Sequence, residues 1–402
     1  MKGLRDLKKL FVVCSLFGSY LMADNLGDIL SHNKSQLFEY DKKSNEIQNK
    51  ILTKSWVNPI RLQYRKNYST QYTTKTTITD NFSISIDQPI FRSGGIYYAI
   101  KYANATYRVG KDSIEIQKRA MIADAVSVLF NLKKIKLQQR KLQYQIKNDK
   151  IDIIQKRDSY SAGILDSSFL DQALLKKSQD ETALLELKFS LMELKQKFSL
   201  LSDKNPDKLR LPKLKIVSKL YYQKHNLQLK RDRDTIEQKR YDAKMTQSKY
   251  LPAISLQGQY IDGTLNPTTV LGIKDEYYNY GFSISMPIDI NSFNDIELAK
   301  VAKLKAQTQL IDTKHTIKEE YDWILNSIEI LDKKIALTYQ DIKLYKNLYK
   351  LTSNLVKAGQ KTQLDADVMF NTLHIKKLDT QIYKVEKQLQ ILQLYMRVNN
   401  VI

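Results

Sequence analysis

The sequence predicts a mainly α protein with a small β part, in which two tandem copies of a long helical hairpin each follow a short helix and a pair of strands. Three observations lead to this fold class. The segment FSISIDQPIF at 82–91 nearly repeats as GFSISMPIDI at 281–290. Glycine and proline are almost missing from the long stretches that follow each copy, and apolar residues recur there with the spacing of a coiled coil.

The repetition extends beyond these two segments. TKSWVNP at 53–59 returns as TQSKYLP at 246–252, and His32–Asn33 returns as His225–Asn226 with the same separation. A repeat this long indicates two large similar halves and not a solenoid of small units. We therefore expect a first repeat over 24–205 and a second over 206–402, each with a short helix, a β-hairpin and a long helical hairpin.

Residues 1–23 predict a secretory signal peptide. Four basic residues precede an apolar run from Leu10 to Met22, and the small residue Ala23 follows it. The run is short for a membrane-spanning helix, which needs about 20 apolar residues. The single cysteine, Cys14, lies inside this segment, and the bulky Val13 before it argues against a lipid anchor.

One glycine interrupts each long helical region. Gly163 is the only glycine between Lys111 and Gln257, and Gly359 is the only one after Phe282. We expect each long helix to reverse there, since a glycine tolerates the positive φ of such a turn. The expected long helices cover 94–160, 168–201, 294–357 and 364–399, and the expected short ones cover 31–55 and 214–249. Apolar steps of three and four residues mark the coiled-coil seams: 184–201, 328–345 and 375–392.

The segments between the short and long helices alternate in polarity. Phe82, Ile84 and Ile86 alternate with polar residues, as do Phe282, Ile284 and Met286. The polar positions between them are Ser83, Ser85, Ser283 and Ser285. This period of two predicts strands with one apolar and one polar face, and two further strands follow Pro59 and Pro252.

Such strands occur both in soluble sandwiches and in membrane barrels. Tyrosines cluster in the expected hairpin loops, as in the aromatic girdles of outer-membrane barrels. The smallest of those barrels have about eight strands, and an open sheet edge is not stable in lipid. Strands in the membrane would therefore require several chains to share one barrel, and three chains would supply twelve strands with the serine faces lining the pore.

At this point the chain resembles the TolC family of outer-membrane channel proteins. The two FSIS strands, the long helices, AGILDSSFLDQA at 162–173 and KAGQKTQLDADVM at 357–369 carry the resemblance over roughly 24–402. It implies a homotrimer with a twelve-stranded transmembrane barrel, continued by a periplasmic α-helical tunnel. It also implies a place in the outer membrane of a Gram-negative bacterium, and work with a periplasmic adaptor (membrane fusion) protein and an inner-membrane efflux pump or ABC transporter.

The resemblance also implies roles for residues near the second turn. An acidic position of the family falls on Asp365, and a basic one falls on Lys361. The next acidic position falls on Val368, so that neighbouring Asp367 is only an approximate substitute. These residues are candidates for a charged ring at the pore entrance, although acidic residues at a helix start also complement the helix dipole. Gly163 and Gly359 would mark the hairpin tips where an adaptor docks.

In the first half the matching polar pair falls on Ser168 and Phe169, and the apolar Phe169 departs from the family pattern. This departure weakens the case for a latch between the two hairpins.

Other classes of function have less support. The formal charge of +22 is spread along the chain, which is typical of solvated helix faces but also occurs in nucleic-acid-binding coiled coils. The predicted signal peptide disfavours the second interpretation, because a secreted chain seldom meets nucleic acid. The four histidines show no metal-binding spacing, no phosphate-binding loop is present, and no residue set predicts an enzyme, so we expect neither a metal nor a cofactor.

The predicted function is the outer-membrane channel of a tripartite efflux or type I secretion system. The alternative is a soluble periplasmic adaptor or coiled-coil scaffold. Drug, metal and protein export stay equally open, because selection of the substrate lies largely in the pump.

Overall fold

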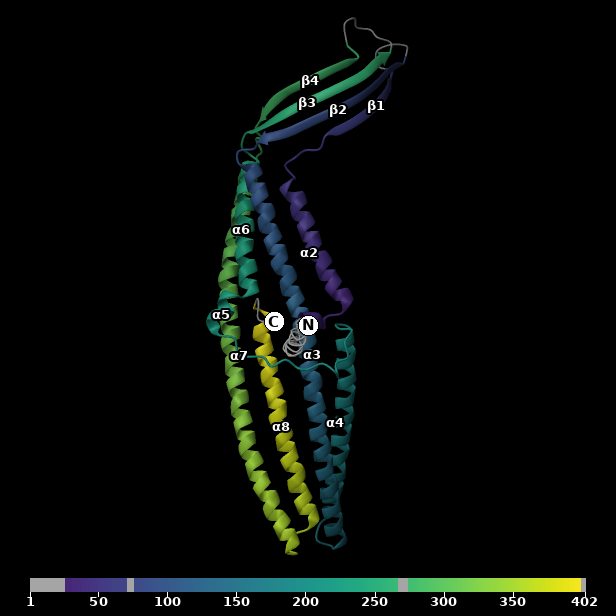
Figure 1. Ribbon diagram of the computed structural model, residues 1–402, viewed down its shortest axis with the longest axis vertical. Coiled ribbons are helices and arrows are strands. Elements are labelled where there is room, and N and C mark those ends of the chain that lie inside the picture. The colour runs from purple at the N-terminus through teal and green to yellow at the C-terminus, as the bar shows by residue number, and fades with distance from the viewer. Residues whose placement is uncertain (1–25, 71–75, 267–273, 399–402) are drawn as a thin grey trace, which may run out of the picture. The chain divides into compact units, whose positions relative to one another are not determined.

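The computed structural model describes residues 26–70, 76–266 and 274–398. The predicted signal peptide lies outside these residues. After a short 3-10 helix, η1 (Leu26–Ile29), the elements of the first half are α2 (His32–Thr53), β1 (Arg61–Ser69), β2 (Thr77–Phe91), α3 (Gly95–Ser161) and α4 (Ser167–Ser199). Those of the second half are α5 (Lys219–Lys224), α6 (Leu227–Ser248), β3 (Ala253–Asn266), β4 (Glu276–Ser285), α7 (Ser292–Lys357) and α8 (Gln363–Met396) (Figure 1). Both halves thus follow one order of elements, although the duplication itself stays a prediction.

The chain divides into two compact units, and each unit takes segments from both halves. The first unit contains η1, the start of α2, residues 115–161 of α3, α4, α5, residues 316–357 of α7, and α8. The second unit contains the rest of α2, the four strands, residues 95–114 of α3, α6 and residues 292–315 of α7.

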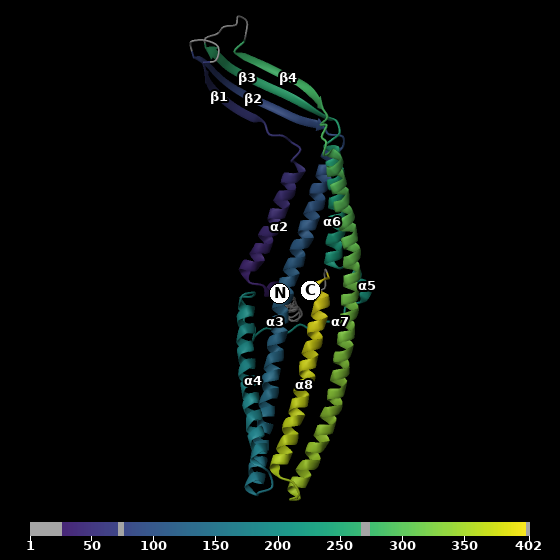
Figure 2. The same ribbon diagram turned by 180° about the vertical axis from the view of Figure 1, so that it is seen from behind.

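Four helical segments of the first unit lie side by side in the order α7, α8, α3, α4 (Figures 1 and 2). Lys387 of α8 pairs with Asp332 of α7 at 2.7 Å. Lys141 of α3 pairs with Asp379 of α8 at 2.8 Å, and Gln139 of α3 donates to the carbonyl of Leu187 in α4 at 3.0 Å. In this order, α7 and α4 are the two outermost helices.

The buried seams of this unit follow the predicted spacing. Leu137 of α3 packs against Leu378 and Ile382 of α8. Ile328 and Leu331 of α7 are also buried. Because i and i+3 or i+4 positions share a helix face, these residues form continuous apolar stripes between neighbouring helices.

The four strands form one antiparallel sheet in the order β1-β2-β3-β4. The central pairing of β2 with β3 joins the two halves of the chain, whereas β1 and β4 are the sheet edges. Pro89 lies near the end of β2 at a register shift, and Pro287 follows β4. A proline is tolerated in these places because no ladder N–H is required there.

The short helix predicted over 214–249 is wrong as a single element. The structure has two helices, α5 and α6, separated at His225 and Asn226. Asn226 forms an isolated antiparallel bridge with Val398, and the backbone N–H of Leu227 donates to the carbonyl of Arg397 at 3.0 Å. This pairing with the C-terminal end of the described chain uses backbone groups that a continuous helix would need for its own ladder.

Among the helices of the described residues, none contains an apolar stretch of sufficient length to span a lipid bilayer.

Candidate pore-lining face and hairpin tips

The register of the sheet brings the four predicted serines onto one face. Directly opposed residues of an antiparallel pair point to the same side. Ser85 opposes Arg61 on one side and Gln259 on the other. Ser83 opposes Gln63, and Ser283 opposes Ser255. Ser285, in the same strand alignment, opposes Ala253. The polar positions predicted separately for each strand therefore merge into one polar surface.

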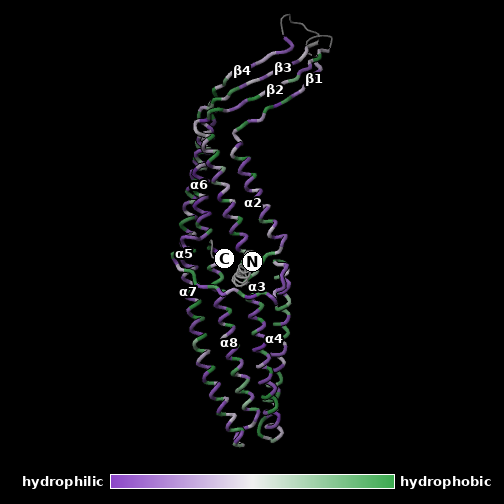
Figure 3. Tube along the Cα trace, in the orientation of Figure 1, coloured by the Kyte–Doolittle hydropathy of each residue, from purple (hydrophilic) through white to green (hydrophobic). Residues whose placement is uncertain are grey.

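The opposite face of the sheet is apolar and exposed in the single chain. Ile84 opposes Leu62 and Tyr260, and Ile284 opposes Ile254. Ile284 is 66% exposed and Tyr280 is 90% exposed. Figure 3 shows apolar and polar residues intermixed along the strands. An exposed apolar face on an otherwise polar chain marks a surface that contacts protein or lipid.

Near the hairpin loops, the apolar face ends in tyrosines and charged groups. The rings of Tyr260 and Tyr278 lie 5.0 Å apart, and both hydroxyls donate to Glu276, at 3.0 and 3.5 Å. Lys66 lies 3.7 Å from Asp80 on the same face. Aromatic residues with polar tips favour the boundary between lipid and water. The sequence indicated the tyrosine cluster but placed Tyr278 in the hairpin loop, whereas the structure has it within β4, opposite Tyr260 of β3.

Both hairpin tips have the same backbone turn. Gly163 and Gly359 have φ of 72°, and a Cβ added at either would meet nothing within 4 Å. The N–H of Gly163 donates to Tyr160, and that of Ile164 donates to Ser159, each at 2.9 Å. The same two bonds recur at Gly359 and Gln360. This is the Schellman ending of a helix, for which glycine is preferred because of its positive φ.

The helices that leave the two tips begin differently. Asp166 caps α4, and its side chain accepts from the N–H of Ser168 at 2.8 Å, which holds the pKa of Asp166 below its usual value. Thr362 caps α8 through a capping box with Asp365. Phe169, three residues after Asp166, stays 45% exposed, so the first tip presents an apolar side chain where the second has a carboxylate.

Asp365 is held by several hydrogen bonds. Its Oδ2 accepts from the backbone N–H of Thr362 at 3.1 Å and from the Thr362 hydroxyl at 2.9 Å. Its Oδ1 accepts from Gln155 of α3 at 3.3 Å. The backbone and hydroxyl of Thr362, and then the positive charge of Lys361, hold the pKa of Asp365 below its usual value. The carboxylate is therefore charged near neutral pH and fixed in orientation.

The other two candidates of the second tip are placed differently. Asp367 accepts from Gln363 within α8 at 2.8 Å. In the described chain no ion pair joins Lys361 to Asp365, and Lys361 is exposed. The capping role of Asp365 could have been found from the sequence, because Thr-x-x-Asp before an apolar helix is a capping-box pattern.

In the described residues no group of three or more His, Cys, Asp or Glu side chains is arranged to hold a metal ion.

Comparison with solved structures identifies the fold. The chain is similar to the CmeC outer membrane channel of Campylobacter jejuni, with a TM-score of 0.74 and 14% identity over 92% of this chain and 84% of that one. It is similar to VceC of Vibrio cholerae, with a TM-score of 0.71 and 13% identity over 90% of this chain and 92% of VceC. It is also similar to the MtrE outer membrane channel of Neisseria gonorrhoeae, with a TM-score of 0.64 and 12% identity over 92% of this chain and 87% of MtrE.

The sequence alone matches no protein-family model and no curated protein. The structural matches cover most of both chains, and they establish the fold. The mainly helical fold with four strands that the sequence predicted is therefore confirmed as the fold of TolC-like channels.

Proposed function

We propose that this chain, which has a TolC-like channel fold, is one subunit of a trimeric outer-membrane channel that works as a passive exit duct. Three chains would join their sheets into a twelve-stranded barrel in the outer membrane of a Gram-negative bacterium. The helical hairpins would extend into the periplasm. An inner-membrane pump or ABC transporter would drive the substrate through a periplasmic adaptor into this duct.

The observation that carries the proposal is the two-faced sheet with two free edges. Ile284 lies on the apolar face and Ser283 on the polar face. This arrangement fits lipid on one side and water on the other. The unpaired edges of β1 and β4 would be unsatisfied in lipid, so each must pair with another chain. Pairing β1 of one chain with β4 of the next closes a barrel without a remaining edge.

The helices of the first unit support the same closure. Trp323, Ile330, Leu337, Leu344 and Leu351 repeat every seven residues along α7, and each is more than half exposed. On α4, at the other end of the helix order, Leu175, Leu185, Phe189 and Met192 are each more than half exposed. Contact between α7 of one chain and α4 of the next would bury both stripes. Such a head-to-tail contact forms a ring when its rotation closes.

The hairpin tips are the proposed docking surface for the adaptor. Gly163 and Gly359 set the two turns, and the tips differ in character, since Phe169 is apolar and Lys361 is charged. The proposed pore-entrance ring consists of three copies of Asp365, with Asp367 and Lys361 nearby. Like charges brought together in a confined opening attract cations, so this end would favour their passage.

Membrane fractionation and single-channel recording test the proposal. The chain should sediment with the outer membrane, migrate as a trimer after crosslinking in detergent, and conduct ions in planar bilayers. A soluble periplasmic chain, as expected for an adaptor or scaffold, would refute it. So would a monomer that conducts. Loss of export of the pump's substrate on deletion, with the pump retained, would identify the exit duct as the missing step.

A further inference from the structure

The charged residues of the sheet are divided between its two faces. In the described strands, Asp80, Asp262 and Glu276 lie on the apolar face near the loops. Asp262 opposes both Phe82 and Glu276, and Asp80 lies two residues from Phe82 on the same strand. The polar face carries Arg61 and Arg65 on β1. Its one carboxylate in the described strands is Asp87, which opposes Gln257. The polar face therefore has an excess of positive charge.

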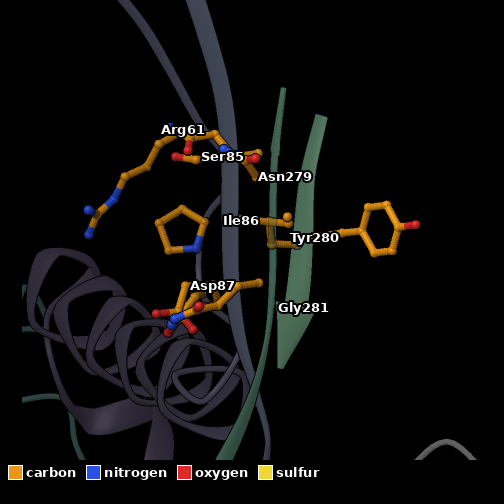
Figure 4. Close-up of a pocket in the computed structure, with 12 residues that line it drawn as sticks. Arg61, Ser85, Ile86, Asp87, Asn279, Tyr280 and Gly281 are labelled. Atoms are coloured by element: carbon orange, nitrogen blue, oxygen red, sulfur yellow. The ribbon is translucent and has the colours of Figure 1, made fainter. Parts of the chain in front are cut away.

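Arg61 begins a row of hydrogen-bonding groups that crosses the whole sheet. It opposes Ser85, which opposes Gln259, which in turn opposes Asn279. These residues, with Asp87, line a hollow of about 460 Å³ on the sheet. Figure 4 shows Arg61 on one side of the sheet and Tyr280 on the opposite side. Hydroxyl, amide and guanidinium groups along one row can all donate hydrogen bonds to an anion.

A second hollow, of about 600 Å³, lies where the strands meet the helices of the second unit. It is lined by Arg92, Lys249 and Trp56, together with the polar-face residues Ser255 and Ser285. In the described part of the chain, Arg61, Arg65, Arg92 and Lys249 form no ion pair within 4.0 Å. None of these four side chains is therefore paired directly with a carboxylate.

A neighbouring chain would not supply the missing carboxylates from its sheet edge. The polar-face residues of β4, from the loop end to the helix end, are Tyr277, Asn279, Gly281, Ser283 and Ser285. None of them is acidic. If β1 of one chain pairs with β4 of the next, Arg61 and Arg65 keep their charge in the assembled barrel.

We infer that the barrel lumen is an anion-selective section of the duct, built by Arg61 and Arg65 and by the polar row beside Arg61. The inference rests on the proposed function. Two arginines against one aspartate leave a charge of +1 on the polar face of the described strands of each chain, and so +3 around a trimeric barrel. A charged cleft concentrates counter-ions, and the fitting substrates are small anions such as carboxylates and phosphates.

The test compares neighbouring positions on the two faces of β1. Arg65→Gln removes a charge from the polar face, whereas Lys66→Gln removes one from the other face a single residue away. Both side chains are exposed, so neither change opens a cavity. The measurement is the chloride-to-potassium permeability ratio of single channels in a tenfold KCl gradient, in an Asp365→Asn background that removes the entrance charge.

We expect Arg65→Gln to lower this ratio by about threefold or more, since a change of one kT in potential changes ion concentration by about that factor. The double variant Arg61→Gln/Arg65→Gln should reverse the selectivity, because its strands retain only Asp87. Arg65→Lys and Lys66→Gln should leave the ratio unchanged. The effect should fade at high salt, where the screening length falls from about 10 Å at 0.1 M to about 3 Å at 1 M.

A multivalent anion distinguishes the lumen from the rest of the duct. Citrate added on the barrel side should reduce the conductance of the parent channel at lower concentration than it does for the double arginine variant. Equal ratios and equal citrate block in Arg65→Gln and Lys66→Gln channels would overturn the inference and leave the channel proposal intact. If the unmodified chain forms no channel at all, the channel proposal fails first, and the inference fails with it.

Discussion

Replacement of Leu337 by alanine tests whether the exposed stripe of α7 is a contact between chains. Leu337 is 61% exposed in the single chain, whereas Leu331, six residues earlier on the same helix, is 8% exposed. If the trimer contact forms as proposed, Leu337 becomes buried only on assembly. Its loss should then weaken the trimer and leave the folded subunit unchanged.

The expected magnitude follows from the area still open to solvent. Burying a whole leucine side chain contributes about 1.5–3 kcal/mol. Because 61% of Leu337 is available for burial, we expect about 1–2 kcal/mol for each contact, and about 3–6 kcal/mol for the three contacts of a trimer. At about 1.4 kcal/mol per tenfold change, the association constant of the trimer should fall by roughly two to four orders of magnitude.

Dilution in detergent measures this effect. The trimer fraction is followed by crosslinking over a concentration series, and helix content is followed by circular dichroism. Leu337→Ala should shift the trimer curve to higher concentration with unchanged helix melting. Leu331→Ala should instead lower the melting temperature, since truncation of a buried leucine costs about 2–5 kcal/mol of folding free energy. If Leu337→Ala behaves like Leu331→Ala, or changes neither curve, the contact between chains is assigned to the wrong face.

Three further predictions concern the strand faces, the turns and the entrance. Ile284→Lys should block insertion, because a lipid-facing cation costs about 2–4 kcal/mol at mid-bilayer, whereas Ser283→Lys should insert and change only conductance. The amount of heat-resistant trimer in outer-membrane fractions measures insertion, and equal amounts for the two variants would show that the faces are misassigned. Gly359→Ala should destabilise the second tip by about 1 kcal/mol, measured as faster amide hydrogen exchange at the tip. Gly359→Trp should abolish export but keep the trimer, and export that survives this change would exclude the tip as the docking surface. Asp365→Asn should weaken cation selectivity and multivalent-cation block at neutral pH, whereas Thr362→Ala should only loosen the helix start; if both variants conduct alike, Asp365 acts only as a cap. Because folding lowers the pKa of Asp365, its carboxylate should stabilise the second tip fully above pH 3.8, the ordinary pKa, and this stabilisation should be lost as pH falls through the lower pKa of the folded state. Amide hydrogen exchange at the tip should therefore depend on pH in this range, and Asp365→Asn should remove that dependence.

The parts of the fold that depend on local sequence could be predicted from it. Gly163 and Gly359 both occur in the predicted turns, because a single glycine in a long helical stretch leaves the chain one position for a positive φ. The seam of α7 was also predicted from local sequence, because apolar residues recur there at steps of three and four residues. Ile328 and Leu331 are buried in this seam. Neither prediction requires knowledge of a distant partner.

Features that depend on tertiary pairing were missed. The break between α5 and α6 follows from the bridge of Asn226 to Val398, which is far away in the sequence. Similarly, the segregation of Arg65 from Lys66 into opposite faces becomes meaningful only once the register places Asp80 beside Lys66 and puts Asp262 and Glu276 on the same face. The alternation within one strand predicts that the strand has two faces. It does not predict the charge of each face, because the neighbouring strands add their own side chains to it.

The second stripe of α7 was missed for another reason. Leu337 repeats with the same seven-residue period as the seam that faces α8, and periodicity alone does not say whether a seam is filled by the same chain or by another one. The exposed fraction of each side chain separates the two, because the seam within the chain is buried and the other one is open.

The geometry of Asp365 bears directly on how the entrance could be held closed. Both carboxylate oxygens already accept hydrogen bonds, from Thr362 and from Gln155, so that the group could not swing towards Lys361 without losing the helix cap. Lys361 nevertheless lowers the pKa of Asp365 through its charge, which requires no contact. A counter-charge that acts at a distance is screened by salt, unlike a direct ion pair that excludes water. An entrance stabilised by Lys361 should therefore open more readily as ionic strength rises, and Lys361→Gln should remove that dependence while the hydrogen bonds from Thr362 keep Asp365 in place.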